Sequence, residues 1–308
     1  MTAPSSALGS ALARAGLLVD RRWIFRLAVA VITGTVIGSW AYGGVFRALL
    51  PPVVVLFPVV LAMGIFVHNL GLFVPVVARG PADSGGVFLT FDDGPDPVYT
   101  PRILDVLRAH GARATFFPIG EQAERHPEIV RRIVEEGHGL GCHTRSHPAL
   151  LNLYSTKRLA AEIRQGRAAV EAAAGRPVRW YRQVAGIVNP RLNRALAGTG
   201  LVLVGWTARA LEGRAKSPED LRRRILEGVD RWARPGAIYN LHDRGIYRSS
   251  LPEGVVLALP DLLAALASKG LATKTLDEMF ADGLPPAGPS WPRSPAETRA
   301  ERPDRSPA

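Results

Sequence analysis

The 308-residue chain has a single cysteine, Cys142, so it can form neither an intrachain disulfide nor a zinc cluster built on cysteines. It also lacks a basic run interleaved with aromatic residues, although its formal net charge is +11. Its arginines are spread over many predicted helix surfaces. We therefore expect no nucleic-acid partner. A basic protein that faces anionic membrane lipid accounts better for the charge.

Charged residues are almost absent from the stretch 27–78, in which Arg47 alone is formally charged. Arg47 divides this stretch into two apolar runs, 27–46 and 48–67, and each has about the 20 residues that a membrane-spanning helix requires. The second run contains three prolines, which membrane helices tolerate when neighbouring groups satisfy the freed backbone. A cleaved signal peptide is the alternative for the first run. Because a second run follows directly, we expect residues 23–78 to form a membrane anchor, a transmembrane helical hairpin.

The positive-inside rule orients this anchor. Arg47 lies between the two runs, whereas four arginines precede the first run: Arg14, Arg21, Arg22 and Arg26. The rule therefore places residues 1–22 in the cytoplasm. Two full crossings would return the rest of the chain to the cytoplasmic side, but an interfacial or re-entrant second run would leave it outside. We expect a membrane protein of the bacterial inner-membrane type, with a cytoplasmic catalytic domain if both runs span.

From Val87 onward, short apolar strands alternate with amphipathic helices. Such alternation predicts an α/β domain of parallel strands with covering helices, closed or nearly closed as a barrel. We place this domain at residues 79–283. The remaining segment, 284–308, is rich in Pro, Arg and Ser and is expected to be disordered.

The ends of the predicted strands carry acids, histidines and one arginine. In a parallel α/β barrel, catalytic groups come from the carboxyl ends of the strands. Those positions hold residue types that move protons or bind metal: Asp92, Asp93, His143, His147, Arg182, Glu212 and His242.

The stretch "HTRSH" places His143 and His147 four residues apart. On a helical turn this spacing puts both imidazoles on one face, close enough to share an ion. Two nitrogens and one carboxylate oxygen form a common catalytic zinc set with an open position for water. Two unrelated surface or packing histidines are the alternative, but the Asp-Asp pair at a preceding strand end favours a metal site. The number and type of ligands do not distinguish the two aspartates, so either Asp92 or Asp93 could be the third ligand.

Five motifs then occur in a characteristic order: "TFDDGP", "HTRSHP", the Arg of "WYRQVAG", the Trp of "VGWTARALEG" and the His of "IYNLHD". With these motifs, residues 86–279 resemble the NodB-type polysaccharide deacetylases, also called carbohydrate esterase family 4. The resemblance implies a distorted (β/α) barrel that hydrolyses an N-acetyl group on an amino sugar with the help of a divalent metal. Zinc is the expected ion, with cobalt, manganese and nickel as alternatives. The implied partner is an amino-sugar glycan or glycolipid.

The same resemblance assigns roles to the acidic pair and the histidines. It implies that Asp92 is the general base that accepts a proton as water attacks the amide. The implied metal ligands are Asp93, His143 and His147.

Four further roles follow from the resemblance. His242 would protonate the departing amine, and Glu212 would pair with it and keep it protonated near neutral pH. Arg182 would keep Asp92 ionised and oriented, because an adjacent cation favours the carboxylate. Trp206 would line the substrate site, although a plain core position is the alternative for a tryptophan.

The sequence departs from the family pattern at three motifs. Where the family has Arg-x-Pro-Tyr-Gly, this chain has Val184 and Ala185, so the backbone amide of Ala185 is the expected oxyanion donor. Where the family has Leu-x-His, with the Leu beside the acyl methyl group, this chain has Asn240 and Leu241 before His242. The family Asp of the fourth motif is replaced by Glu212. We expect Asn240 and Leu241 at the substrate, and Asn240 leaves the identity of the acyl group open.

Two other functional classes are compatible with parts of the pattern. A catalytically inactive, membrane-anchored carbohydrate-binding protein would explain the altered third and fifth motifs. A phosphotransferase that forms an aspartyl phosphate is disfavoured, because it needs two aspartates separated by one residue and these are adjacent. The retained proton-transfer and metal positions favour the hydrolase, and the oligomeric state stays open.

Overall fold

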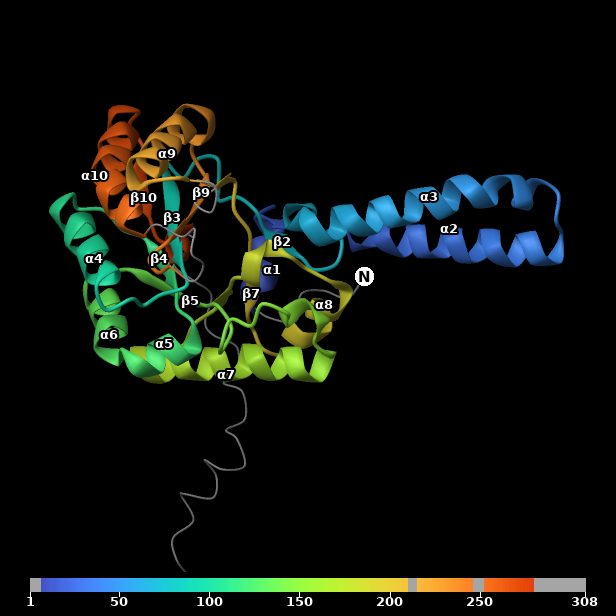
Figure 1. Cartoon of the computed structure of the whole chain (residues 1–308), viewed down its shortest axis with the longest axis horizontal. Helices are drawn as coiled ribbons and strands as arrows, with labels where there is room; N and C mark the ends of the chain where they lie inside the picture. The colour runs from blue at the N-terminus through green and yellow to red at the C-terminus, as the bar shows by residue number, and fades with distance from the viewer. Residues whose placement is uncertain (1–6, 210–214, 246–251, 280–308) are drawn as a thin grey trace, which may run out of the picture.

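The computed structural model describes residues 7–209, 215–245 and 252–279, which form an α/β body with a long helical hairpin projecting from it (Figure 1). The described part of the body contains a ten-stranded sheet. Its strands are β1 (Leu18–Val19), β2 (Val76–Val77), β3 (Gly86–Asp92), β4 (Thr115–Phe117), β5 (Gly139–Cys142), β6 (Trp180–Tyr181), β7 (Val202–Val204), β8 (Ala208–Arg209), β9 (Ile238–His242) and β10 (Ala272–Lys274).

The strand order is β1-β2-β7-β6-β5-β4-β3-β9-β8, and β10 pairs in addition with β3. Every pair is parallel except β1 with β2, as the alternating pattern predicts. Every residue of the central strand β3 is buried, as expected for a sheet covered on both faces. In the described part of the chain the strand order ends at β1 and β8, which do not pair with each other, so the curled sheet is open between these two strands. The expected distorted barrel is confirmed.

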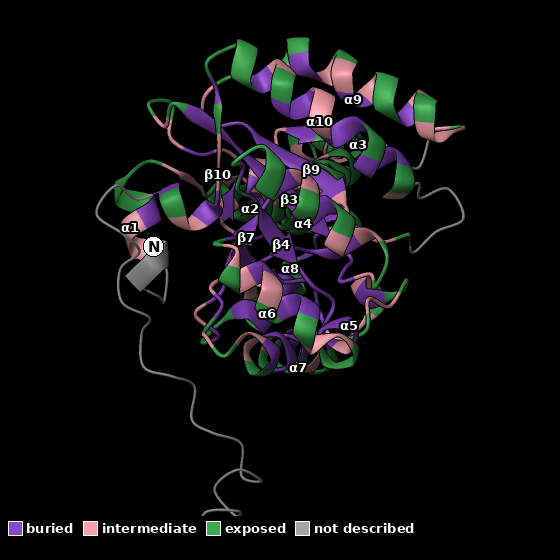
Figure 2. Ribbon diagram, turned by 90° about the vertical axis from the view of Figure 1, so that its left-hand side faces the viewer, coloured by how far each residue is buried: buried purple, intermediate pink, exposed green. Residues whose placement is uncertain are grey.

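Helices cover the sheet and present exposed outer faces, while the strands in the centre are buried (Figure 2). Local signals set the helix ends: the Ser155 side chain accepts the backbone N–H of Arg158 where α7 begins, and Gly175 ends α7 in a left-handed conformation. The helices of the body are α1 (Ala7–Arg14), α4 (Tyr99–Ala109), α5 (Gly120–Arg125), α6 (Pro127–Glu135), α7 (Thr156–Ala174), α8 (Pro190–Leu196), α9 (Pro218–Trp232) and α10 (Pro252–Ser268). Short 3₁₀ turns are η1 (His68–Leu70), η2 (Leu151–Leu153), η3 (Val184–Gly186) and η5 (Leu276–Met279).

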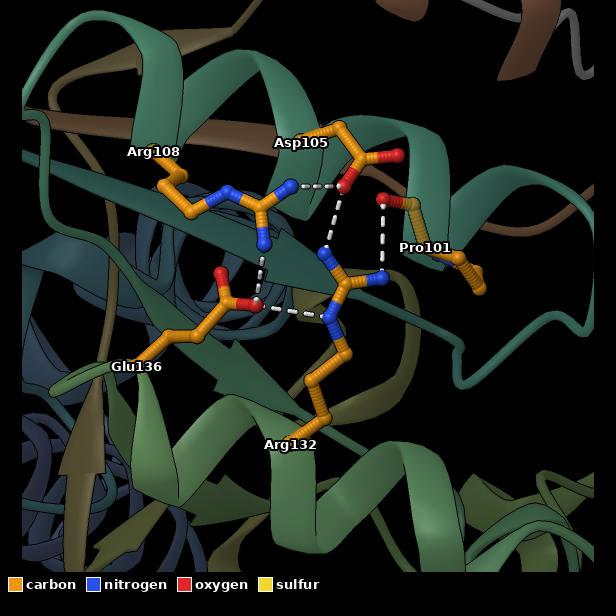
Figure 3. A network of polar contacts seen from close by, with 5 residues as sticks. All are labelled: Pro101, Asp105, Arg108, Arg132 and Glu136. Carbon is orange, nitrogen blue, oxygen red and sulfur yellow. Dashed lines mark hydrogen bonds and ion pairs between the residues drawn. The ribbon is translucent and has the colours of Figure 1, made fainter.

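A polar network joins the outer helices α4 and α6 (Figure 3). The Arg132 guanidinium donates to Asp105 Oδ1 at 2.6 Å, to Glu136 Oε1 at 2.7 Å and to the Pro101 carbonyl at 3.4 Å. Arg108 contacts the same two carboxylates at 2.9 and 3.5 Å. These groups lie on the surface, where ion pairs contribute little to stability. The network positions two covering helices and belongs to no site.

The hairpin consists of α2 (Arg22–Ala41) and α3 (Val45–Phe66), which run side by side away from the body (Figure 1). Both are long and apolar enough to cross a membrane. Most of their large side chains are exposed, so neither is the buried core helix of a soluble protein. The three prolines of the second run lie inside α3: Pro51, Pro52 and Pro58.

The chain on both sides of the hairpin joins the body. Strand β1 precedes the hairpin, β2 follows it, and the two pair with each other before β2 pairs with β7. Leu12 of α1 is fully buried in a core cluster with Val77, Phe117 and Trp180. The sheet thus includes residues on the N-terminal side of the boundary expected at residue 79. The expected disordered tail, 284–308, lies outside the described residues.

Replacing Leu12 with Ala tests this integration. Removing a fully buried leucine side chain should lower the free energy of unfolding by about 2–5 kcal/mol. Chemical denaturation of the detergent-solubilised chain measures the change, with the exposed Ala13→Ser variant as the control. An unaltered unfolding midpoint for Leu12→Ala would show that α1 does not belong to the core.

Candidate active site

The acidic pair lies where β3 leaves the sheet. Asp92 is the last residue of β3 and pairs with His242 at the end of β9, so the base and the acid expected from the sequence are neighbours across two parallel strands. Asp93 follows with φ 81°, a conformation rare for a residue with a side chain, and turns the backbone out of the strand. Both carboxylates are buried, at 3% and 4% exposure.

Three side chains converge beside Asp92. Asp93 Oδ1 lies 3.2 Å from His143 Nε2 and 3.4 Å from His147 Nε2, and the three potential ligand atoms all lie within 4.8 Å of one another. The structure therefore brings together the predicted metal ligands. The expectation of a helical turn for His143 and His147 is wrong, because the residues between them form a loop after β5. Thr144 at φ 66° and His147 at φ 52° reverse the chain and bring the second imidazole back.

The electrostatics of this cluster match a metal site. Burial acts to raise the pKa of Asp93, but the contact with His143 and the positive charge of the surrounding histidines outweigh it and lower this pKa to about 2. Burial acts to lower the pKa of His143, but the two aspartates raise it overall. Burial, reinforced by His143, lowers the pKa of His147 to about 4. In this arrangement Asp93 is ionised and His147 is neutral near pH 7.

A further hydrogen bond orients one of the predicted ligands. His143 Nδ1 lies 2.9 Å from the carbonyl oxygen of Arg182, so a proton on Nδ1 leaves Nε2 facing Asp93. Asp93 Oδ1 is buried and accepts no hydrogen bond from the described residues. A buried carboxylate oxygen without a hydrogen bond, next to two imidazole nitrogens, fits a divalent ion with an open coordination position. The residues present therefore fit the metal that the resemblance implies.

Asp92 is held by two donors. The fully buried guanidinium of Arg182 lies 3.4 Å from Asp92 Oδ2 and donates to the Thr90 hydroxyl at 3.1 Å. Asn240 Nδ2 donates to the same Asp92 oxygen at 2.7 Å. Asp92 Oδ1 is buried and has no hydrogen-bond partner among the described residues, which leaves this oxygen for a water molecule or a proton. The predicted pairing of Arg182 with Asp92 is present.

The fifth motif differs from the expectation at one residue. Alternate residues of a strand face opposite sides of the sheet. Asn240 is on the side of Asp92, whereas Leu241, expected beside the substrate, packs into the main hydrophobic core. Sequence reasoning missed the bond from Asn240 to Asp92, because strand pairing between residues 148 positions apart creates it.

The third motif forms the turn η3, in which Ala185 has φ 54° and is exposed at the rim. The Trp206 ring lies 5.5 Å from the Arg182 guanidinium and is half-buried, so it adjoins the site as expected. Its other neighbour, His68, was not expected; the two ring centroids are 4.1 Å apart. Glu212 lies outside the described residues, so its pairing with His242 stays a prediction.

A third buried aspartate, Asp243, also missed, lies next to the acidic pair. The fully buried Asp243 accepts the Thr100 hydroxyl at 2.6 Å, and its backbone N–H donates to the Asp92 carbonyl at 3.2 Å. Burial, reinforced by the charge of Asp93, raises the pKa of Asp243 to about 7. A side chain at Gly94 would collide with its carboxylate, which explains the glycine there. In the sequence, the position of Asp243 directly after His242, in the stretch "LHD", was the one signal that could have placed it at the site.

Comparisons with known proteins agree with this geometry. A family model for polysaccharide deacetylase matches residues 79–204. A chitooligosaccharide deacetylase of Sinorhizobium fredii is 32% identical over 67% of this chain and 97% of its own length. A peptidoglycan-N-acetylglucosamine deacetylase of Bacillus cereus is 32% identical over 65% of this chain and 70% of its own.

Solved structures show the same fold. The crystal structure of a peptidoglycan N-acetylglucosamine deacetylase superposes with a TM-score of 0.59 at 33% identity, covering 66% of this chain and 92% of the other. The enzymes of this family are metal-dependent hydrolases of amide bonds, and the cluster of Asp93, His143 and His147 could bind such a metal. The chain belongs to the polysaccharide deacetylases of carbohydrate esterase family 4.

Proposed function

We propose that the protein removes an N-acyl group, in the first place N-acetyl, from an amino sugar of an envelope polysaccharide or lipid-linked glycan. The observation that carries this proposal is the convergence of a positioned carboxylate, Asp92, with three residues that could bind a metal and with His242 on the adjacent strand. The similarity to chitooligosaccharide and peptidoglycan deacetylases supports the amino-sugar substrate. An inactive binding protein would not need Asp92 and His242 on adjacent strand ends beside a candidate metal site.

Amide hydrolysis requires an activated water, a polarised carbonyl and a protonated leaving group. A divalent ion held by Asp93, His143 and His147, in the first place zinc, would polarise the carbonyl and acidify water. Asp92 accepts the proton of the attacking water on Oδ1, while Arg182 and Asn240 hold Oδ2.

The remaining steps fall to residues around the rim. The backbone amide of Ala185 donates to the oxyanion as it forms, and its exposed position on η3 suits this role. His242 protonates the departing amine. Glu212 keeps His242 charged, and Trp206 forms a wall of the sugar site. Asn240 donates to Asp92, so a polar side chain stands beside the base where the family has leucine.

Incubation of the zinc-loaded chain with amino-sugar glycans tests the proposal. Mass spectrometry should detect a free amine together with acetate or formate. Asp92→Asn should retain the metal and lose turnover, because it removes the base and leaves the ligands intact. His143→Ala should lose both metal and turnover. The exposed Asp83→Asn variant is the control and should keep both metal and turnover. Full activity in Asp92→Asn or in His143→Ala would contradict the assignment.

Metal affinity should rise with pH. The raised pKa of His143 means that a proton must leave before Nε2 can bind an ion, whereas His147, with its pKa of about 4, needs no such loss. Below the pKa of His143, the apparent affinity should therefore increase about tenfold per pH unit, one proton being released per ion. Calorimetric zinc titrations in buffers of different ionisation enthalpy measure both quantities. An affinity that is constant between pH 5.5 and about 7 would contradict the ligand set.

Asn240→Leu restores the residue typical of the family and removes one donor from Asp92. A hydrogen bond to a charged group contributes about 1.5–3 kcal/mol. If Asn240 positions the base, kcat should fall about tenfold or more, with a smaller change in KM and no loss of bound zinc. Steady-state kinetics and metal analysis provide the readouts. An unchanged kcat would assign Asn240 to packing alone.

A further inference from the structure

The two segments that flank the hairpin are parts of one folded unit. Leu18 pairs with Val77 and Val19 with Val76, so β1 and β2 close the base of the hairpin as an antiparallel pair. The Arg21 backbone N–H also donates to the Gly71 carbonyl at 3.0 Å across this base. Residues before and after the hairpin therefore cannot lie on opposite faces of a membrane while this fold exists.

The hairpin geometry and the charge distribution then orient the body. Helices α2 and α3 run antiparallel, and the turn between them is remote from the body (Figure 1). Arg47 lies near that turn, whereas the arginines before the hairpin lie at the end adjoining the body. The positive-inside rule places the more basic end in the cytoplasm. The sheet, and with it the metal cluster, lies on the same face.

The site is attached directly to the end of the anchor. The backbone N–H of Val188, on the loop after η3, donates to the Ile65 carbonyl in the last turn of α3 at 3.1 Å. Two residues after α3 ends, His68 packs against Trp206, and Asn69 Nδ2 donates to the Trp206 carbonyl at 2.6 Å. These contacts keep the rim that carries Ala185 and Trp206 at a fixed distance from the membrane surface.

The loop after the metal ligand His147 adds an apolar rim. Leu150 and Leu153 are 65% and 72% exposed, and Asn152 between them bonds to Gln183 and Asn189 beside α8. Helix α8 lies at the base of the hairpin and contacts it through Arg22 and Asn193 at 3.2 Å (Figure 1). Two exposed leucines on the same side as the anchor fit the interfacial region of a bilayer.

We infer that the catalytic body lies on the cytoplasmic face of the membrane and that its substrate is an N-acylated amino sugar carried by a lipid in that leaflet. This inference rests on the proposed deacylase function. A site fixed to the membrane surface meets sugars that the bilayer itself holds, and confinement to one surface raises their effective concentration. A soluble nucleotide sugar or a mature polymer outside the membrane gains nothing from this attachment.

Thiol labelling of spheroplasts tests the shared face. The native Cys142 is a silent background, because it is fully buried and burial raises the pKa of its thiol to about 12. Exposed probes are Tyr42→Cys at the hairpin turn, Ala13→Cys before the hairpin and Glu128→Cys on α6. A membrane-impermeant maleimide should label Tyr42→Cys in intact spheroplasts, and the other two only after permeabilisation.

Each other labelling pattern overturns part of the inference. Opposite behaviour of Ala13→Cys and Glu128→Cys would contradict the shared face. Labelling of both in intact spheroplasts would place the body outside. Protection of Tyr42→Cys until permeabilisation would show that the hairpin does not cross the membrane.

The substrate class is tested with the full chain, zinc-loaded in lipid nanodiscs. N-acetyl and N-formyl glucosamine are supplied in three forms: linked by diphosphate to a polyprenyl chain, linked to uridine diphosphate, and as a soluble oligomer. We expect kcat/KM for the lipid-linked form to exceed the others at least about tenfold. Equal turnover of the soluble oligomer would overturn the lipid carrier and leave the proposed function standing. No turnover of any form would overturn both the proposed function and the lipid carrier. The labelling experiment would still show on which face of the membrane the body lies.

Matched leucine variants separate the rim from general stability. The double variant Leu150→Ser/Leu153→Ser should lower kcat/KM severalfold on the lipid-linked sugar relative to the soluble oligomer. Leu257→Ser removes an exposed leucine, 44% accessible, from α10 on the far side of the body and should change neither value (Figure 1). Equal losses on both substrates in the double variant would contradict contact of the rim with lipid.

Discussion

The guanidinium of Arg182 is fully buried, and an unpaired cation in a protein interior costs several kcal/mol. Its partner is Asp92, the last residue of the central strand, with further contacts to the Thr90 hydroxyl and the Phe117 ring. The backbone carbonyl of Arg182 orients His143. One buried arginine thereby links the base to a predicted metal ligand. Because the buried guanidinium needs a charged partner, it holds Asp92 in place even without substrate.

The apolar hairpin is an integral part of this architecture. A tether attached through a flexible linker would leave the barrel free to tumble, but here the chain enters and leaves the hairpin through paired strands that extend the catalytic sheet. The last turn of α3 then contacts the loop after η3, and η1 contacts Trp206. Burial, with the charges of Arg182 and Arg209, lowers the pKa of His68 to about 4, so a neutral imidazole packs here without adding charge beside Arg182. The base of the hairpin and the rim of the active site therefore share the same residues.

The parts of the fold and the site that depend on local patterns could be predicted. The alternation of apolar runs with amphipathic helices identified the parallel barrel, and the Asp-Asp pair at a strand end identified the place of the chemistry. The spacing of His143 and His147 correctly predicted that the two imidazoles lie close together, but the helical turn on which that prediction rested is absent. The two imidazoles meet because left-handed residues reverse a loop, and no helical periodicity encodes that reversal. Asp243 and His68 could not be assigned, because their surroundings come from segments distant in sequence.

By itself, the sequence determined the order of the elements, the apolar hairpin and the candidate acids, histidines and arginine at the strand ends, because these follow from residue type and short-range spacing. Only the tertiary structure decided that Asn240 supports Asp92, that Leu241 belongs to the core and that α1 shares a core with the barrel. Strand register sets the first two, since adjacent residues of a strand face opposite sides. The third depends on long-range pairing across the hairpin, which brings residues 18–19 against residues 76–77.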